Sequence, residues 1–270
     1  MARQATGKRK NNKRQSSTQN AASALRWKTK GYWADLALAL GYGLLTLVVA
    51  LSISWVVLAK QNFIYGVWHD HAGIGAGIDE FGPQNRHKVG FGDTSRQERL
   101  RVFSEINFSV HRGGEGLGDI RYQSPSSHGA QKLLHSAEII HLQDVANLID
   151  VLFMAAVVAF LMWLGLGGYL VLAARRMPGI ARQTQSLAIA LLPVLLIVMV
   201  VGPKEVFNQF HIWIFPEDHE WFFFYQDSLM STLMLAPNLF GWIALVLMAL
   251  ATFIFVFLQC VLAFLARKFS

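Results

Sequence analysis

All nine histidines fall in two stretches of the chain, residues 61–147 and 204–237, and none lies in the long apolar runs between them. Imidazole is the side chain whose unperturbed pKa lies nearest neutral pH, so it is the commonest general acid or base in enzymes. These two stretches are therefore where chemistry is expected. The histidines are His69, His71, His87, His111, His128, His135, His141, His211 and His219.

One group of polar residues has helical spacing. The sequence from His128 onward predicts a single helix that runs into the second apolar run, and Glu138, His141 and Asp144 follow on it at steps of three. Residues three apart share a helix face, so His141 can meet either carboxylate. The alternative interpretation is a solvated charged stripe at the end of a helix.

Other catalytic patterns are missing from the sequence. A Glu-x-x-His pair such as Glu138–His141 occurs in di-iron bundles, but no second pair follows, and His-Glu-x-x-His is absent. Gly-x-Ser-x-Gly is also absent, and Cys260 lies inside an apolar run where an active thiol is not expected. We therefore predict no metal and no cofactor, and favour acid–base chemistry by histidine aided by carboxylates.

The second histidine-bearing stretch is unusually aromatic. Such a segment next to an apolar run is expected at the membrane interface, with its rings at headgroup depth. It predicts either an anchoring interfacial loop or the wall of a lipid-binding groove, and both place His211 near the membrane surface. The aromatic residues are Phe207, Phe210, Trp213, Phe215, Trp221, Phe222, Phe223, Phe224 and Tyr225.

The elements that must position these residues are membrane spans. Hydrophobic types make up 53% of the 270 residues and charged types 15%, whereas globular domains have about 25% charged residues. A helix needs about 20 apolar residues to cross the hydrocarbon. Four runs qualify, and the first is too long for the apolar core of a signal peptide. The sequence predicts an all-α integral membrane protein with spans at 32–60, 148–174, 183–203 and 238–266.

Charge predicts the orientation of these spans. The 1–31 tail carries nine basic residues and no acid, the 175–182 link three basic residues and no acid, and the 267–270 tail two basic residues. By the positive-inside rule these segments are cytoplasmic, and the 1–31 tail is expected to be disordered. The 61–147 subdomain and the 204–237 aromatic loop are then extracytoplasmic. This distribution of charge also argues against a nucleic-acid partner.

Local patterns inside 61–147 are weaker. The Gly-rich part, residues 66–92, predicts irregular chain near the membrane. The 94–103 segment is polar and predicts a short helix. Apolar and polar residues alternate from Ile106 to Val110, which fits either a strand or the end of that helix.

The segments EIIHLQDVANL (138–148) and FHIWIFPEDHEWFFFYQDSLM (210–230) resemble the lipoprotein intramolecular transacylase family, called Lit. The four-span order with a large first outer loop also matches that family. The resemblance implies that His141 and His211 are the two essential histidines. Asp144, Trp221 and Asp227 match the family pattern and, with Glu138, are the predicted supporting residues.

The resemblance further implies an acyl shift on a diacylglyceryl-modified bacterial lipoprotein, at the extracytoplasmic face of the bacterial cytoplasmic membrane. The sn-2 acyl chain would move from the glycerol oxygen to the cysteine α-amino group. We hypothesise that His141, oriented by Asp144 or Glu138, is the base and that His211 is the acid or oxyanion donor, although the sequence allows the opposite roles equally.

Two other functions remain open from the sequence. A non-catalytic membrane scaffold would use the aromatic loop as a contact for lipid or for a partner protein. A metal-dependent membrane hydrolase would use Glu138, His141, Asp144 and His211 as ligands. A transporter is disfavoured because the apolar runs 36–59, 151–174, 183–203 and 238–266 contain no charged residue and the sequence shows no internal repeat.

Overall fold

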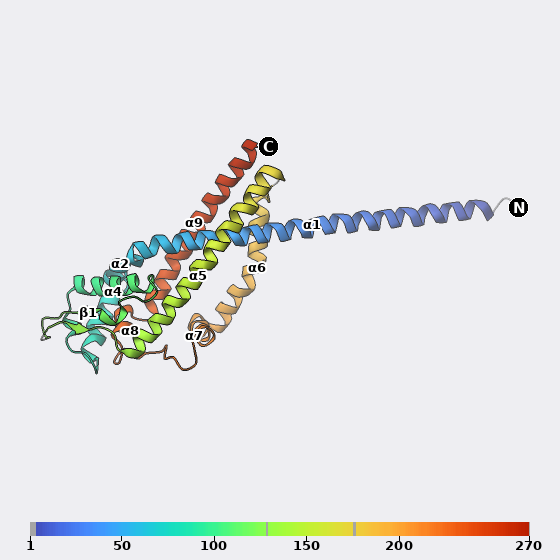
Figure 1. Ribbon diagram of the computed structural model, residues 1–270. Helices are drawn as coiled ribbons and strands as arrows, with labels where there is room; N and C mark the ends of the chain where they lie inside the picture. Colours follow the sequence, from blue (N-terminus) through green and yellow to red (C-terminus); the bar gives the residue numbers. More distant parts are fainter. Residues whose placement is uncertain (1–3, 128, 175–176, 270) are drawn as a thin grey trace.

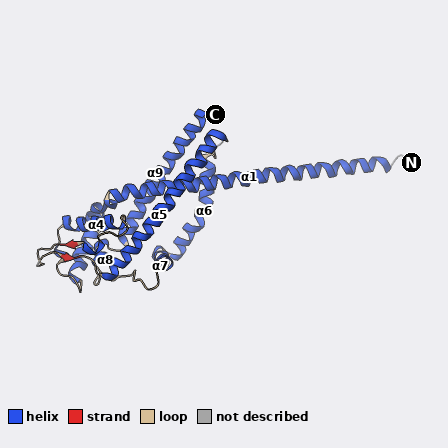
Figure 2. Ribbon diagram, viewed as in Figure 1, coloured by secondary structure: helices blue, strands red, loops and turns tan. Residues whose placement is uncertain are grey.

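The computed structural model describes the backbone of residues 4–127, 129–174 and 177–269, and the side chains of residues 31–127, 129–174 and 177–268. This part of the chain is mostly helical (Figure 2). The helices are α1 (Gln4–Lys60), α2 (Tyr65–His71), α3 (Ile74–Phe81), α4 (Arg96–Val110), α5 (Ser136–Gly168), α6 (Ile180–Val201), α7 (Pro203–Ile214), α8 (Leu229–Met234) and α9 (Asn238–Phe269). A π-helical turn, Tyr169–Ala173, extends α5.

Strands β1 (Arg121–Tyr122) and β2 (Gln131–Lys132) form a short antiparallel pair, with Arg121 opposite Lys132. This pair is the one departure from the predicted all-α class within the described residues. The pair closes a loop, residues 123–130, in the segment that leads into α5.

Among the described residues, four helices are long and apolar enough to cross a membrane, which is the predicted number of spans. Their mean hydropathy over the most apolar window lies between 2.3 and 2.7. The chain thus has the fold of a multi-pass membrane protein. The spanning ranges are Gly31–Lys60, Ser136–Ala173, Ile180–Val201 and Asn238–Lys268.

Helix α1 is the central span, because α5, α6 and α9 all pack against it (Figure 1). Leu187 of α6 lies so close to Gly43 that a side-chain carbon there would be 3.3 Å from it. Trp163 of α5 donates a 3.0 Å hydrogen bond to the hydroxyl of Thr46. Helices in a membrane gain little from burying apolar surface, because lipid is equally apolar. Close packing at small residues and buried hydrogen bonds hold them together instead.

The tail is predicted to be disordered, whereas the described backbone is helical from Gln4, where α1 begins before it continues into the first span (Figure 1). Residues 4–30 are rich in Ala, Gln, Lys and Arg and contain no proline. These are good helix formers, and the span supplies a helix that they can extend without a new nucleation step.

Between α1 and α5 the chain folds into a subdomain with its own hydrophobic core, to which α8 also contributes. The Tyr65 ring stacks on Phe103 at 3.9 Å between centroids, and its hydroxyl donates a 2.7 Å hydrogen bond to the carbonyl of Leu233. The core therefore fixes the end of the 204–237 segment although that segment is distant in sequence. Its largest fully buried members include Tyr65, Phe91, Tyr122, Ile74, Ile78, Leu117, Leu133, Leu229, Leu233 and Leu239.

The Gly-rich part of this subdomain is helical over much of its length, since α2 and α3 lie in it, and residues 85–90 are irregular as predicted. Its glycines serve close packing. A side-chain carbon on Gly75 would lie 2.9 Å from the His69 ring, and one on Gly77 would lie 2.5 Å from Leu235. The low helix propensity of glycine is outweighed here by tertiary contact.

The ambiguous segment at 106–110 is the last turn of α4, not a strand. Ile106 and Val110 are both buried while Phe108 is exposed, so the apolar positions follow the four-residue helical spacing. The start of α4 is fixed by Ser95, whose hydroxyl accepts from the backbone N–H of Glu98 at 3.2 Å.

The helix leading into the second span begins at Ser136, eight residues later than predicted. His135 is its N-cap, and the Glu138 carboxylate accepts a 2.7 Å hydrogen bond from the His135 backbone N–H. This capping box satisfies a backbone donor at the helix start. The residues just before it are held instead by the β1–β2 pair.

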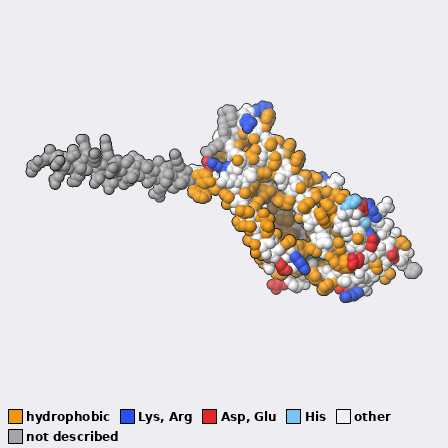
Figure 3. Space-filling view, turned by 180° about the vertical axis from the view of Figure 1, so that it is seen from behind, with side chains coloured by type: hydrophobic (Ala, Val, Ile, Leu, Met, Phe, Trp, Pro, Cys, Tyr) orange, Lys and Arg blue, Asp and Glu red, His pale blue; other side chains and the backbone are white. Residues whose placement is uncertain are grey.

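The second half of α6, residues 191–201, makes few contacts with the other spans. Ten of the eleven residues from 191 to 201 are exposed, Val200 by 85%. The back of the molecule is largely hydrophobic and is hollowed near its middle (Figure 3). Gly202, with a φ of 94°, then lets the chain turn into α7.

Candidate active site

His211 lies on the last turn of α7, a helix that starts with Pro203 directly after the turn at Gly202. The ring is 9% exposed, and its Nδ1 lies 2.8 Å from the carbonyl oxygen of Phe207. A carbonyl can only accept, so Nδ1 carries the proton and the neutral ring has its lone pair at Nε2. Burial lowers the pKa of His211, although the Phe207 carbonyl opposes that shift.

His141 lies on the second turn of α5 and is 8% exposed. Its ring faces that of His211, with 6.2 Å between centroids and 28° between planes. Its Nδ1 is buried and has no hydrogen-bond partner. The structure thus brings together the two histidines that the sequence singled out, 70 positions apart, with no hydrogen bond between them.

Aromatic side chains surround the two imidazoles. Phe215 lies 5.0 Å from His141 and 5.3 Å from His211, between ring centroids, and is itself buried. Trp221 lies 4.8 Å from His211, and Phe223 lies 6.0 Å from His141. The segment between α7 and α8 therefore covers the histidine pair with apolar rings, which excludes water from one side of it.

Asp144 does not hold His141 as predicted. Its Oδ2 lies 2.6 Å from Nδ1 of His219, which comes from the aromatic segment. This contact raises the pKa of His219, chiefly through the hydrogen bond to the carboxylate. Asp144 is close enough to His141 to act on it through charge alone. Sequence reasoning missed His219 because 75 residues separate it from Asp144 and no spacing connects them.

Glu138 does not orient His141 either. It is 1% exposed and accepts a 2.5 Å hydrogen bond from the Ser228 hydroxyl and a 3.0 Å bond from the Met230 backbone N–H. With the bond from His135, these contacts use the carboxylate to fix the start of α8 on α5. Glu138 binds α8 rather than His141 because α8 packs into the same hydrophobic core as α5, next to Glu138.

Asp227 lies outside the ring cluster. It pairs with Arg86 at 3.2 Å and with His87 at 3.5 Å, on the surface of the subdomain. The Arg86 backbone N–H also donates to the carbonyl of Gln226 at 2.8 Å. Asp227 therefore ties the aromatic segment to the subdomain rather than touching either imidazole.

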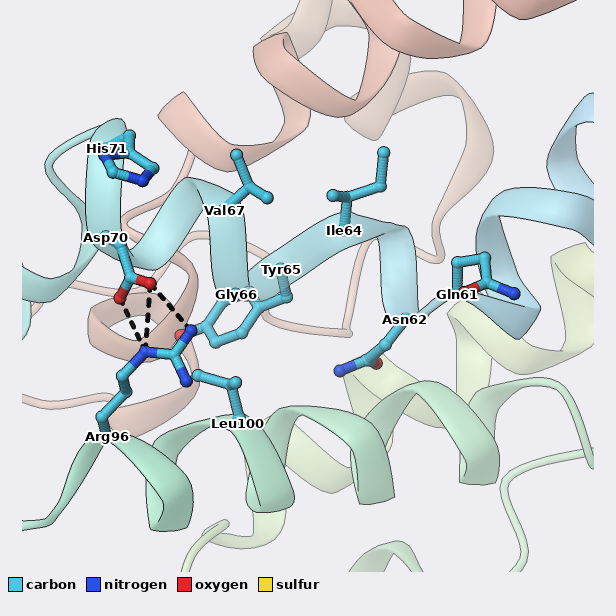
Figure 4. A pocket seen from close by; sticks show the side chains of 10 residues that line it. All are labelled: Gln61, Asn62, Ile64, Tyr65, Gly66, Val67, Asp70, His71, Arg96 and Leu100. Carbon is cyan, nitrogen blue, oxygen red and sulfur yellow. Dashed lines mark hydrogen bonds and ion pairs between the residues drawn. The ribbon is translucent and has the colours of Figure 1, made fainter.

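Two cavities lie away from the histidine pair. One, of about 360 Å³, lies between the start of α2 and α4 (Figure 4), and there Arg96 binds both oxygens of Asp70 at 2.7–3.1 Å. The other, of about 340 Å³, lies at the opposite end of the spans beside Met177 and Arg267. We place the candidate active site at His141 and His211, because these two buried imidazoles can act as acid and base and lie side by side.

No group of three or more His, Cys, Asp or Glu side chains that could hold a metal ion occurs within the part of the chain that the structure describes. Glu138 and Asp144 face Ser228 and His219, not a shared centre with the two histidines. The four residues considered for a metal site from the sequence are therefore not arranged as one.

The comparisons with known proteins point to one family. The family model described as "Lipoprotein intramolecular transacylase Lit" matches residues 121–240, a range that contains both histidines. The resemblance stated from the sequence is thus confirmed over that range. No curated protein matches the chain.

A solved structure shares the fold. It is the in meso structure of the membrane-integral lipoprotein intramolecular transacylase Lit from Bacillus cereus, carrying a histidine-to-arginine substitution. The TM-score is 0.62 at 14% sequence identity, and the match covers 91% of this chain and 97% of that one.

Proposed function

We propose that this protein is a lipoprotein intramolecular transacylase that moves the sn-2 acyl chain of a diacylglyceryl-cysteine lipoprotein to the cysteine α-amino group. The observation that carries the proposal is the pairing of His141 with His211, 6.2 Å apart and largely buried, inside the segment that matches the Lit family. No cofactor is needed, because amine and ester belong to one substrate and orientation supplies much of the acceleration.

The geometry supports a division of roles opposite to the one hypothesised from the sequence. The Phe207 carbonyl holds the Nδ1 proton of His211, so Nε2 presents a lone pair that can take the proton of the attacking amine. Nδ1 of His141 has no partner, so that ring is free to carry its proton on Nε2. From there it can donate a hydrogen bond to the tetrahedral oxyanion, and His211 then passes the proton it took from the amine to the departing glycerol oxygen, so that both rings end neutral.

The site lies near the interface at the end of the spans opposite to the C-terminus (Figure 1). If the basic 175–182 and 267–270 segments are cytoplasmic, as the positive-inside rule predicts, this arrangement supports a site on the extracytoplasmic face of the cytoplasmic membrane. The exposed second half of α6 and the hollow in the hydrophobic surface (Figure 3) suit the acyl chains of a lipid-anchored substrate.

A synthetic diacylglyceryl lipopeptide with a deuterated sn-2 chain, placed in vesicles with the purified protein, tests this function. Transfer leaves the total mass unchanged, moves the label onto the peptide nitrogen in fragment spectra, and leaves one alkali-labile ester instead of two. A mixture of labelled and unlabelled lipopeptides should give no crossed product. A lipopeptide whose α-amine is acetylated is the control and should not react. Label that stays on glycerol would overturn the proposal.

The pH profile should show an acid limb below pH 6.5. The pKa of His211 is lowered from its ordinary 6.5, so the ring is neutral at pH 7 and becomes charged only when the pH falls through that lower value. The base is then lost and the rate declines. Initial rates in vesicles from pH 4.5 to 8 measure this. An acid limb centred well above pH 6.5 would contradict the assignment of His211 as the base.

Chelation should leave the rate unchanged within about twofold, because the proposed chemistry uses proton transfer at one imidazole and hydrogen bonding from the other. The measurement compares rates before and after dialysis against EDTA. A loss of rate that added Zn²⁺ or Mn²⁺ restores would instead favour the metal-dependent hydrolase, for which release of free fatty acid is the second sign.

A further inference from the structure

The segment that covers the two histidines is held on α5 at two places, one helical turn to each side of His141. Three residues before His141, Glu138 binds Ser228 and Met230. Three residues after it, Asp144 binds His219. His141 thus lies between two carboxylates that grip the same segment, residues 215–230.

The two attachments differ in exposure. Glu138 is buried and its partners are a hydroxyl and a backbone N–H, which do not titrate near neutral pH. Asp144 is 15% exposed and His219 33%. The groups with charge around His219 are Asp144 on α5 and Asp218 on its own segment, and both favour the charged imidazole. The second attachment is therefore an ion pair that water and protons can reach.

His219 is also well placed along the chain. It lies between Phe215 and Trp221, the two residues of the segment whose rings contact His211. The His219 attachment therefore holds the chain between the two rings, whereas the Glu138 attachment lies beyond them at Ser228. Misplacement of about 1 Å near a reacting group can cost about 100-fold in rate.

We propose that His219 is a positioning residue of this site, whose ion pair with Asp144 fixes Phe215 and Trp221 over the His141–His211 pair. The inference rests on the proposed function for its kinetic consequence. Its structural consequence, order of residues 215–223, does not depend on that function.

The kinetic test compares four variants in the vesicle assay. His219→Ala and Asp144→Asn should each lower kcat about 10–100-fold, and the double variant should lose no more than the worse single one, because both remove one contact. His219→Lys keeps a cation for Asp144 and should retain most of the activity. His71→Ala, an exposed histidine of the same outer subdomain, is the matched control and should match the parent.

The pH profile separates positioning by charge from a merely structural role. In the parent, kcat should fall as rising pH removes the proton of His219, whose pKa is raised above 6.5. In His219→Lys this alkaline limb should move up by more than two pH units, since lysine ionises near 10.4. A limb that stays in place in His219→Lys, or additive losses in the double variant, would overturn the proposal.

Hydrogen exchange gives a readout that needs no activity. Residues 215–223 should lose protection in His219→Ala and keep it in His219→Lys and His71→Ala. A parent without transacylase activity defeats the proposed function, while this exchange pattern still decides the positioning. Full activity together with unchanged exchange in His219→Ala defeats the positioning alone.

Discussion

Replacing His141 or His211 with alanine should lower the rate of N-acyl transfer by about 10²–10⁴-fold, the usual contribution of a positioned acid or base. Either change removes one partner from the imidazole pair whose rings lie 6.2 Å apart. The double variant should be little worse than either single one, since the two groups act in one step. The measurement is the initial rate of product formation by mass spectrometry in vesicles.

Three controls make this result interpretable. His71→Ala changes a histidine of the outer subdomain that contacts neither imidazole, and it should leave the rate unchanged. His211→Gln retains hydrogen-bonding ability but cannot exchange a proton near neutral pH, so it should be as slow as His211→Ala, whereas His141→Gln still donates a hydrogen bond and should be faster than His141→Ala. Parental rates in both alanine variants, with normal folding, would favour the non-catalytic scaffold.

Replacing Glu138 with alanine should give the largest loss of stability. The change removes the buried acceptor of the Ser228 hydroxyl and of the backbone N–H groups of Met230 and His135. A buried donor without a partner costs about 1–3 kcal/mol, and this change leaves three such donors. We expect about 3–5 kcal/mol, measured as a fall in the free energy of unfolding or in Tm in detergent.

Glu105→Ala is the matched control for this change. Glu105 is 42% exposed and binds Arg101 on the surface of α4, where an ion pair contributes about 0–1 kcal/mol. Glu138→Gln should lie between, because the amide oxygen still accepts from Ser228 while its nitrogen cannot accept from His135. A Glu138→Ala protein as stable as the Glu105→Ala protein would show that the carboxylate is not a structural anchor.

The spans could be predicted from the sequence because hydropathy over 20 residues is a local property. Helix α5 was also predicted as far as Glu138, His141 and Asp144 are concerned, since three-residue spacing is local as well. The Gly-rich helices were missed because Gly75 and Gly77 leave room for the side chains of His69 and Leu235, which pack closely against them. Such contacts have no signal in periodicity.

The site itself was only half predictable. His141 and His211 were singled out by resemblance to a family, and their mutual distance follows from how α7 turns back on α5. The partners of Asp144 and Glu138 come from residues 75 and 90 positions away. Helical spacing made His141 the nearest candidate for both carboxylates, while the three-dimensional fold offered His219 and Ser228.

The exposed second half of α6, residues 191–201, has a consequence for the kinetics of the proposed reaction. Because residues 191–201 are almost all exposed and apolar, the proposed function implies that a lipid-anchored substrate approaches the histidines sideways, without leaving the bilayer. Collisions then occur in two dimensions. The relevant concentration is the mole fraction of lipoprotein among lipids, so diluting vesicles at a fixed lipid ratio should leave turnover constant, whereas adding inert lipid should slow it.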